Sequence, residues 1–136
     1  MERENLNSGA PWEEKVGYSR AVKIGDTIEI SGTAPVKDGK PFHGTAYEQA
    51  VCCLEIIKDT LESLGAKLED VVRTRMYVTD ISLWAEFGKA HGEFFGDIRP
   101  VTTMVEVSKL IDAEMLIEIE ATAVTTKWNV VQNYLK

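Results

Sequence analysis

The segment from 116 to 124, LIEIEATAV, places Glu118 and Glu120 two residues apart in an alternating apolar and polar pattern. Side chains at positions i and i+2 of a β-strand lie on one face, roughly 6–7 Å apart. Two carboxylates at that separation have the geometry for glycoside hydrolysis. The simpler interpretation is that both are ordinary polar strand residues that pair with Arg73 and Arg75. We favour this simpler interpretation on the residues alone.

The other reactive residue types show no catalytic or metal-binding arrangement. His43 falls in a loop and His91 in a helical segment, without the spacing of metal ligands. Cys52 and Cys53 are adjacent and cannot form an ordinary disulfide framework; helical periodicity turns Cys53 toward the core and Cys52 toward a flank, where it could be exposed. Ser31 lacks a nucleophile-elbow sequence and a nearby histidine. The sequence therefore predicts neither a metal site nor a nucleophilic serine.

Length and charge limit the class of protein. The chain has 136 residues and a formal net charge of −7, which fits one domain with its own core. The acidic balance makes nucleic acid and anionic membranes poor candidates for partners. No apolar stretch approaches the ~18–20 residues of a membrane span, and the polar N-terminal segment does not resemble a secretory signal. Together with the adjacent cysteines, these features predict a cytoplasmic compartment.

Two periodicities alternate along the chain and predict the elements that must position these residues. Period-two segments indicate strands, segments with apolar residues every three or four positions indicate helices, and Gly25-Asp26 indicates a hairpin turn. The order is ββαβαββ, which predicts an α+β domain over 1–126, a sheet with two helices on one face, and a tail over 127–136. The expected strands are 18–24, 27–32, 71–79, 101–107 and 115–125, and the expected helices are 45–64 and 82–95.

Two helices cover only one face of a sheet, so the residues of the opposite face are informative. Strand parity assigns to it a mixture of polar and apolar side chains. A solvated face with cross-strand ion pairs is one interpretation, and a face buried against another subunit is the other. The apolar members Met104, Leu116 and Tyr77 favour the subunit interface. The remaining members are Glu29, Ser31, Arg73, Arg75, Thr102, Glu106, Glu118 and Glu120.

Six segments in the same order and spacing resemble the reactive-intermediate deaminase family, also called Rid or YjgF-like and formerly endoribonuclease L-PSP. They are GYSRAV, ISGTAP, DVVRTRMYVTD, FGKAHGEFF, RPVTTMVEV and LIEIEATAV, within residues 15–125. The resemblance implies a mixed-sheet fold like the chorismate mutase of the bacillus type. It also implies a homotrimer whose sheets form a central barrel, with three small-molecule clefts between neighbouring subunits.

The resemblance further implies a reaction and its residues. The best-known branch of the family hydrolyses enamines and imines released by pyridoxal-phosphate enzymes, without a metal or organic cofactor of its own. Carried over by position, the family pattern places Tyr18, Ser31, Gly32 and Glu118 in the cleft, with Glu118 as the carboxylate that positions water. From the residues alone, Tyr18 is an interface aromatic, Ser31-Gly32 a strand-end turn and Glu118 an ion-pair partner.

Two positions depart from the family pattern. The arginine that holds the substrate carboxylate is Thr102 here, and an asparagine of the second helix is Gly88. Threonine supplies one hydroxyl and no charge, so it does not replace a guanidinium. We expect Arg20 or Arg99 to supply positive charge for a small anionic ligand. The alternatives are an imine hydrolase with an altered substrate and a non-catalytic module that binds a metabolite or partner; an endoribonuclease fits the charge least well.

Overall fold

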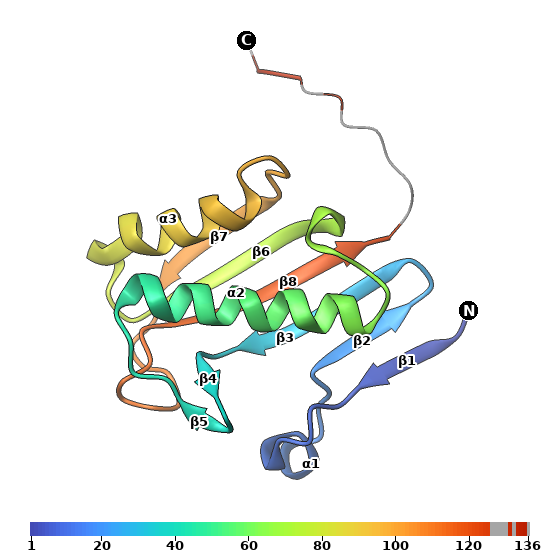
Figure 1. Cartoon of the computed structure of the whole chain (residues 1–136), viewed down its shortest axis with the longest axis horizontal. Coiled ribbons are helices and arrows are strands. Elements are labelled where there is room, and N and C mark those ends of the chain that lie inside the picture. The colour runs from blue at the N-terminus through green and yellow to red at the C-terminus, as the bar shows by residue number, and fades with distance from the viewer. Residues whose placement is uncertain (126–130, 132, 136) are drawn as a thin grey trace.

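The computed structural model describes residues 1–125, 131 and 133–135. Its six-stranded sheet has the order β1-β2-β3-β8-β6-β7, and β4 and β5 form a separate hairpin (Figure 1). Only β6 and β7 pair in parallel within the described sheet. The elements are β1 (Arg3–Leu6), α1 (Pro11–Val16), β2 (Ala21–Ile24), β3 (Thr27–Thr33), β4 (Val36–Lys37), β5 (Lys40–Pro41), α2 (Ala46–Ser63), β6 (Val71–Val78), α3 (Trp84–Phe95), β7 (Val101–Glu106) and β8 (Ile117–Val124).

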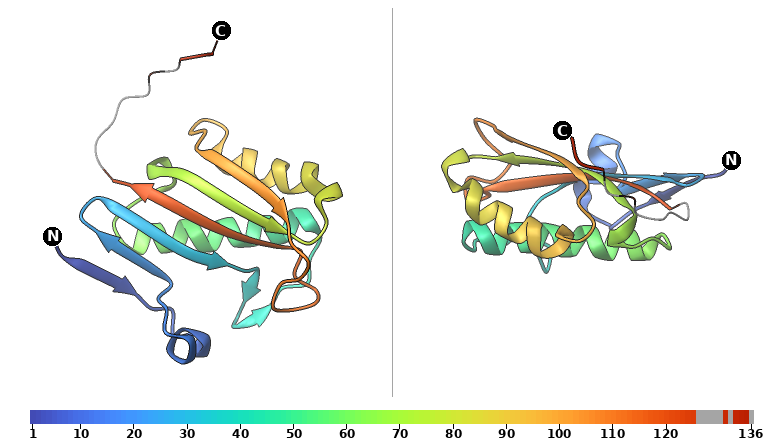
Figure 2. Two further views of the ribbon diagram at one scale, coloured as in Figure 1. Left: turned by 180° about the vertical axis from the view of Figure 1, so that it is seen from behind. Right: turned by 90° about the horizontal axis from the view of Figure 1, so that it is seen from above.

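Helices α2 and α3 pack side by side on one face of the sheet, and the other face carries no helix over its central strands (Figure 2). This confirms the predicted α+β class, the mixed sheet and the placement of both helices. We call the uncovered side the open face. None of the helices in the described residues is long and apolar enough to cross a membrane. The predicted tail over 127–136 lies largely outside the described residues.

Local signals explain the hairpin and the long helix. Gly25 takes a φ of 57° at the turn between β2 and β3, a conformation that costs glycine little. Thr45 caps α2 through a capping box with Glu48: each side chain bonds the backbone N–H of the other residue. The apolar stripe of α2 is buried against the sheet. Cys52 is also buried, with 4% exposure, so it is a structural residue like Cys53 and is not exposed on the helix flank.

Strand β7 is an edge strand, and its orientation corrects the parity assignment. Thr102 is paired with Thr74 of β6, and Met104 with Met76. Thr74 and Met76 are buried in the core beneath the helices. Paired residues of parallel strands point to the same side, so Thr102 and Met104 face the helices rather than the open face. The same register turns Glu106 to the helix side, opposite Val78.

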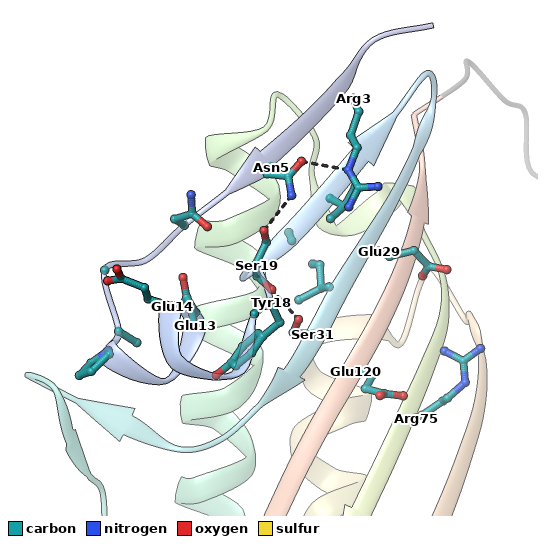
Figure 3. Close-up of a pocket in the computed structure, with 18 residues that line it drawn as sticks. Arg3, Asn5, Glu13, Glu14, Tyr18, Ser19, Glu29, Ser31, Arg75 and Glu120 are labelled. Atoms are coloured by element: carbon teal, nitrogen blue, oxygen red, sulfur yellow. Dashed lines mark hydrogen bonds between the residues drawn. The ribbon is translucent and has the colours of Figure 1, made fainter.

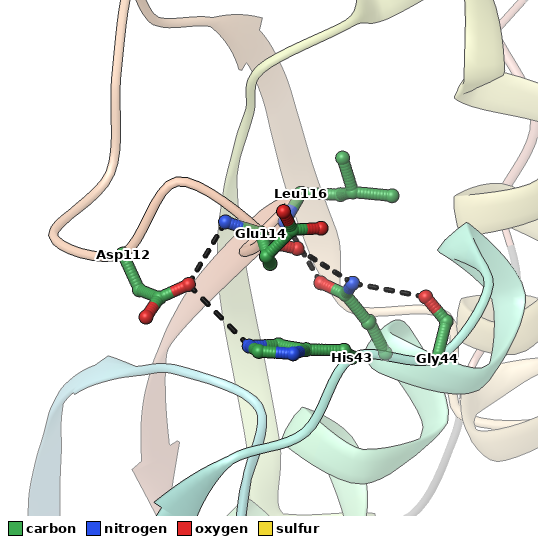
Figure 4. A network of polar contacts seen from close by, with 6 residues as sticks. His43, Gly44, Asp112, Glu114 and Leu116 are labelled. Atoms are coloured by element: carbon green, nitrogen blue, oxygen red, sulfur yellow. Dashed lines mark hydrogen bonds and ion pairs between the residues drawn. The ribbon is translucent and has the colours of Figure 1, made fainter.

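A buried glutamine ties the loop before β8 to the start of α2 (Figure 4). Gln49 is 1% exposed. Its side-chain amide donates to the carbonyls of Gly44 and Glu114 at 3.0 and 2.9 Å, and its oxygen accepts from the N–H of Leu116 at 2.8 Å. In the same network His43 Nε2 lies 3.6 Å from Asp112 Oδ1. These contacts fix where β8 begins and therefore where Glu118 lies.

Candidate functional site

A β-bulge at Ser31 and Gly32 shapes the first group of candidate residues. β3 pairs with β8 in regular register up to Ile30, opposite Ala121, and resumes at Thr33, opposite Ile119. Two residues of β3 therefore lie opposite one residue of β8, which bends the strand and removes backbone pairing locally. The Ser31 hydroxyl donates to the carbonyl of Ser19 at 2.6 Å.

Glu118 lies against this bulge. A Cβ added at Gly32 would meet the Glu118 Oε2 atom at 2.7 Å, so only glycine permits the observed approach. The carboxyl is half-buried. Burial raises its pKa above the ordinary value, the charge of Arg20 opposes this, and Glu120 adds to the increase. A carboxyl in this environment exchanges a proton more readily near neutral pH than an ordinary glutamate does.

Arg20 is turned toward the bulge rather than toward solvent. Its Nη2 atom donates to the Gly32 carbonyl at 2.8 Å and to the Thr33 hydroxyl at 3.3 Å. Its buried Nε atom has no hydrogen-bond partner among the described residues. Burial lowers the pKa of the guanidinium, against the opposing charges of neighbouring groups. Arg20 therefore holds the bulge and places a positive charge in the electrostatic environment of Glu118.

Tyr18 lies at the rim of an open hollow of about 950 Å³ on the side of the sheet that includes Ser31 (Figure 3). Gly17 ends α1 with a φ of 88°, and the Tyr18 N–H then donates to the Glu13 carbonyl at 3.0 Å. The Glu13 carboxylate is buried and accepts from the backbone and hydroxyl of Ser8. This local network fixes the segment that presents Tyr18, whose side chain remains partly exposed.

The two glutamates of β8 have different surroundings. Glu120 accepts a hydrogen bond from the Tyr77 hydroxyl at 2.9 Å and lies opposite Arg75. Glu120 is therefore a polar strand residue held by Tyr77 on the open face, but the predicted ion pairs of the two glutamates with Arg73 and Arg75 are not formed within 4.0 Å among the described residues. Glu118 makes no ion pair within 4.0 Å and no hydrogen bond to another described residue. Of the two carboxyls, Glu118 is thus the one without a hydrogen-bond partner among the described residues.

Thr102 belongs to a second group, at the α3–β7 edge. The hydroxyls of Thr102 and Thr74 are 2.7 Å apart, and the Thr74 hydroxyl is 2.8 Å from His91 Nε2. The His91 ring packs on Phe95 with ring centroids 4.8 Å apart, and burial lowers its pKa. The sequence predicted no metal-binding role for His91 and did not single out Thr74. Their link required the register between β6 and β7, which no local pattern reveals.

The remaining candidates lie elsewhere. Arg99 is exposed, with a φ of 57° before Pro100, and borders a hollow of about 430 Å³ that Glu69 and Val72 also line. Gly88 lies on α3 with open space where a Cβ would be. The structure therefore brings Arg20, Gly32 and Glu118 together at the bulge, whereas Tyr18 and Ser31 line the hollow beside it together with Glu120. Thr102 lies apart from them, because β6 separates β7 from Glu118 on β8, and both β6 and β8 separate β7 from the residues of β3.

The chain belongs to the endoribonuclease L-PSP family, whose model matches residues 10–125. It is 34% identical over 119 residues to SCO2049 of Streptomyces coelicolor, covering 87% of this chain and 89% of that protein. It is also 38% identical over 108 residues to the RutC family protein PYRAB12510 of Pyrococcus abyssi, covering 78% and 84% of the two chains.

Solved structures show the same fold. The crystal structure of Rv2704 from Mycobacterium tuberculosis, described as a member of the YjgF/YER057c/UK114 family, matches with a TM-score of 0.83 and 47% identity. The match covers 90% of this chain and 99% of that one. NMB1025 of the YjgF family from Neisseria meningitidis matches with a TM-score of 0.78 and 26% identity, over 94% and 98% of the two chains. The predicted family and fold class are therefore confirmed.

Proposed function

We propose that this protein hydrolyses small enamines or imines to carbonyl compounds and ammonia, in clefts between the subunits of a homotrimer. The observation that carries the proposal is the Glu118 carboxyl, which is half-buried, free of hydrogen bonds to described residues, and held against Gly32 with a raised pKa. Such a group is suited to move protons between water and a substrate nitrogen.

The division of the candidate residues supports a site shared between subunits. Within one chain, Glu118 on β8 and Thr102 on β7 are separated by β6, and Thr102 faces the helices while Glu118 lies on the open face. A neighbouring subunit docked on the open face and the β7 edge would bring one group to the other. Val101 and Val105 of β7 are exposed, and β7 has a free edge, which are features that a subunit contact would cover.

The chemistry needs only water and proton transfer. Ionised Glu118 takes a proton from water while the water oxygen adds to the carbon of a protonated imine, which gives a neutral carbinolamine. Glu118 then returns the proton to the amine nitrogen, the C–N bond breaks, and the carbon retains oxygen as a carbonyl. Glu118 accepts the proton of the carbinolamine hydroxyl and passes it to the departing ammonia. The products are therefore a carbonyl compound and ammonium. The Tyr18 hydroxyl and the bulge backbone would orient the reacting groups.

The test uses two imines generated in situ by flavin oxidases: 2-iminobutyrate from 2-aminobutyrate and the imine of butan-2-one from butan-2-amine. Semicarbazide captures each imine, and a hydrolase slows semicarbazone formation by removing it. We expect the protein to slow semicarbazone formation from at least one of the two imines. Glu118→Gln should reduce this imine hydrolysis by about 100-fold or more. Glu4→Gln is the matched control, because Glu4 is an exposed strand glutamate of β1 that does not line the hollow. Equal rates with and without protein for both imines would refute the proposal.

The oligomeric state is tested separately. Light scattering at the mass of three chains supports the shared site, whereas the mass of a single 15.2 kDa chain contradicts it. The second candidate function is a non-catalytic metabolite-binding module, and Thr102 in place of a guanidinium favours it, because tight capture of an amino-acid-derived carboxylate is lost. Binding of a small metabolite by the trimer without turnover would identify this alternative.

A further inference from the structure

The hydrogen-bonded series Thr102–Thr74–His91 is not used by the Glu118 chemistry. It runs from an exposed edge into the interior: Thr102 is exposed, Thr74 is 0% exposed, and His91 is half-buried. Successive distances of 2.7 and 2.8 Å make it a continuous chain of hydrogen bonds. Of the three residues, Thr102 is the most exposed.

The polarity of this chain is set by the histidine. Each threonine hydroxyl has one proton to donate and lone pairs to accept with. If His91 Nε2 carries the ring proton, it donates to Thr74, Thr74 donates to Thr102, and Thr102 is left to donate outward. If Nδ1 carries the proton, the direction reverses and Thr102 offers a lone pair outward. Either arrangement satisfies the buried Thr74 hydroxyl, so the chain is adaptable at little cost.

His91 stays uncharged at neutral pH, because burial lowers its pKa and its ring packs on Phe95. A neutral imidazole has one N–H and one lone pair, which is the condition for both directions. On the same helix, no atom lies within 4 Å of the place where a Cβ at Gly88 would be, and the Trp84 side chain is 62% exposed. Helical spacing places these two residues on the same side of α3 as His91. The edge therefore combines a reversible polar contact with an uncrowded helix surface and an exposed aromatic ring.

We propose that Thr102, backed by Thr74 and His91, binds the C=N or C=O end of the ligand, so that this site selects imines and ketones without a carboxylate. The inference rests on the proposed shared cleft and names its substrate class. A substrate N–H needs an acceptor and a product carbonyl needs a donor, and the reversible chain supplies both at one position. To a carboxylate, these three residues would offer one hydrogen bond from the Thr102 hydroxyl and no positively charged partner.

The two arginines that the sequence suggested as cations for a ligand lie in other environments. Arg20 is engaged by the Gly32 carbonyl and the Thr33 hydroxyl. Arg99 borders the separate hollow near Glu69. A carboxylate ligand would also add a negative charge to a site that already holds Glu118. The selection against carboxylates therefore follows from the arrangement of the whole group rather than from Thr102 alone.

The experiment compares two probes of the same size, 2-oxobutanamide and 2-oxobutyrate, titrated into the full chain and followed by protein NMR. We expect the amide to bind at least about tenfold more tightly. Thr102→Val should weaken the amide about threefold to tenfold and leave the carboxylate unchanged. Thr103→Val is the matched control, since Thr103 is the neighbouring exposed threonine of β7 and is paired with Arg75 on the open face. The control should change neither affinity.

A second readout reports on the chain itself. The ¹⁵N shifts of His91 distinguish its two tautomers, and a carbonyl probe should enrich the form with the proton on Nε2. Thr74→Val, which removes the middle hydroxyl at nearly constant volume, should abolish that response. Equal affinity for both probes, no binding of either probe, or an unresponsive His91 ring overturns the inference. Absence of Glu118-dependent hydrolysis alongside selective amide binding overturns the catalytic proposal instead.

Discussion

Replacing Gln49 with methionine tests how the fold positions β8 and Glu118. The change keeps the length and approximate volume of the side chain but removes all its hydrogen bonds. The Gly44 and Glu114 carbonyls and the Leu116 N–H each lose a partner. A hydrogen bond contributes about 0.5–1.5 kcal/mol net, and water can reach the exposed Glu114 segment, so we expect a loss of about 2–3 kcal/mol in the free energy of unfolding.

Urea unfolding measures this loss. With a slope of about 1.5 kcal/mol/M for a chain of this size, the midpoint should fall by about 1–2 M. Wild type and variant must be compared at one protomer concentration, because an oligomer's apparent stability depends on concentration. Hydrogen exchange gives the local readout: the Leu116 amide should lose its protection before the amides of β6 do.

The control is Thr60→Val, which removes one hydrogen bond, from the Thr60 hydroxyl to the Ile56 carbonyl at 2.8 Å. That carbonyl belongs to a helix that already uses it, so the control should cost less than about 1 kcal/mol. A Gln49→Met variant no less stable than Thr60→Val, with normal Leu116 protection, would refute the reasoning. The loop before β8 would then be positioned by other contacts.

Three further predictions concern the candidate site, and a fourth concerns an exposed position of α3. Burial raises the pKa of Glu118, so folding favours the protonated carboxyl, and the contribution of this group to stability is present at low pH and is lost as pH rises through the folded pKa. Glu118→Gln should therefore raise the urea midpoint at neutral pH. The same variant should leave the midpoint unchanged below about pH 4, the ordinary carboxyl range. Gly32→Ala should displace the Glu118 carboxyl, which its Cβ would meet at 2.7 Å, and lower imine hydrolysis with little loss of stability. Gly92→Ala, in an exposed helical position with open space, should raise the free energy of unfolding by about 0.5–1 kcal/mol in urea and leave hydrolysis unchanged. Thr102→Arg should improve 2-oxobutyrate binding about tenfold or more by titration, and no gain would contradict a ligand position beside Thr102.

The elements with strong local signals were predictable from the sequence. The β2–β3 hairpin follows from its glycine turn, and α2 from the Thr45 cap and a buried apolar stripe. β1 was not predicted, because the sequence RENL has no alternation and the strand lies exposed at a sheet edge. The short helix α1 was missed for a related reason: its six residues are mostly exposed, and its one buried side chain is the polar Glu13.

The orientation of β7 shows why parity fails at an edge. Its sequence, VTTMVE, has valines and a methionine on opposite sides, and most of the strand is exposed, so composition does not distinguish its two faces. The parallel pairing with β6 decides the matter, and that pairing joins segments separated by α3. The Thr102–Thr74 contact and its extension to His91 therefore come from tertiary structure alone.

The position of Arg20 changes what the site's charge means. The sequence suggested a cation for an anionic ligand, whereas the structure gives Arg20 to the bulge and to the surroundings of Glu118. In the proposed cleft, a carboxylate on the substrate would raise the pKa of Glu118 further and reduce the ionised form that accepts a proton from water. A protonated imine without a carboxylate has the opposite effect, because its positive charge favours ionised Glu118. The charge of the substrate thus acts on the base as well as on binding, and both effects favour the same class of substrate.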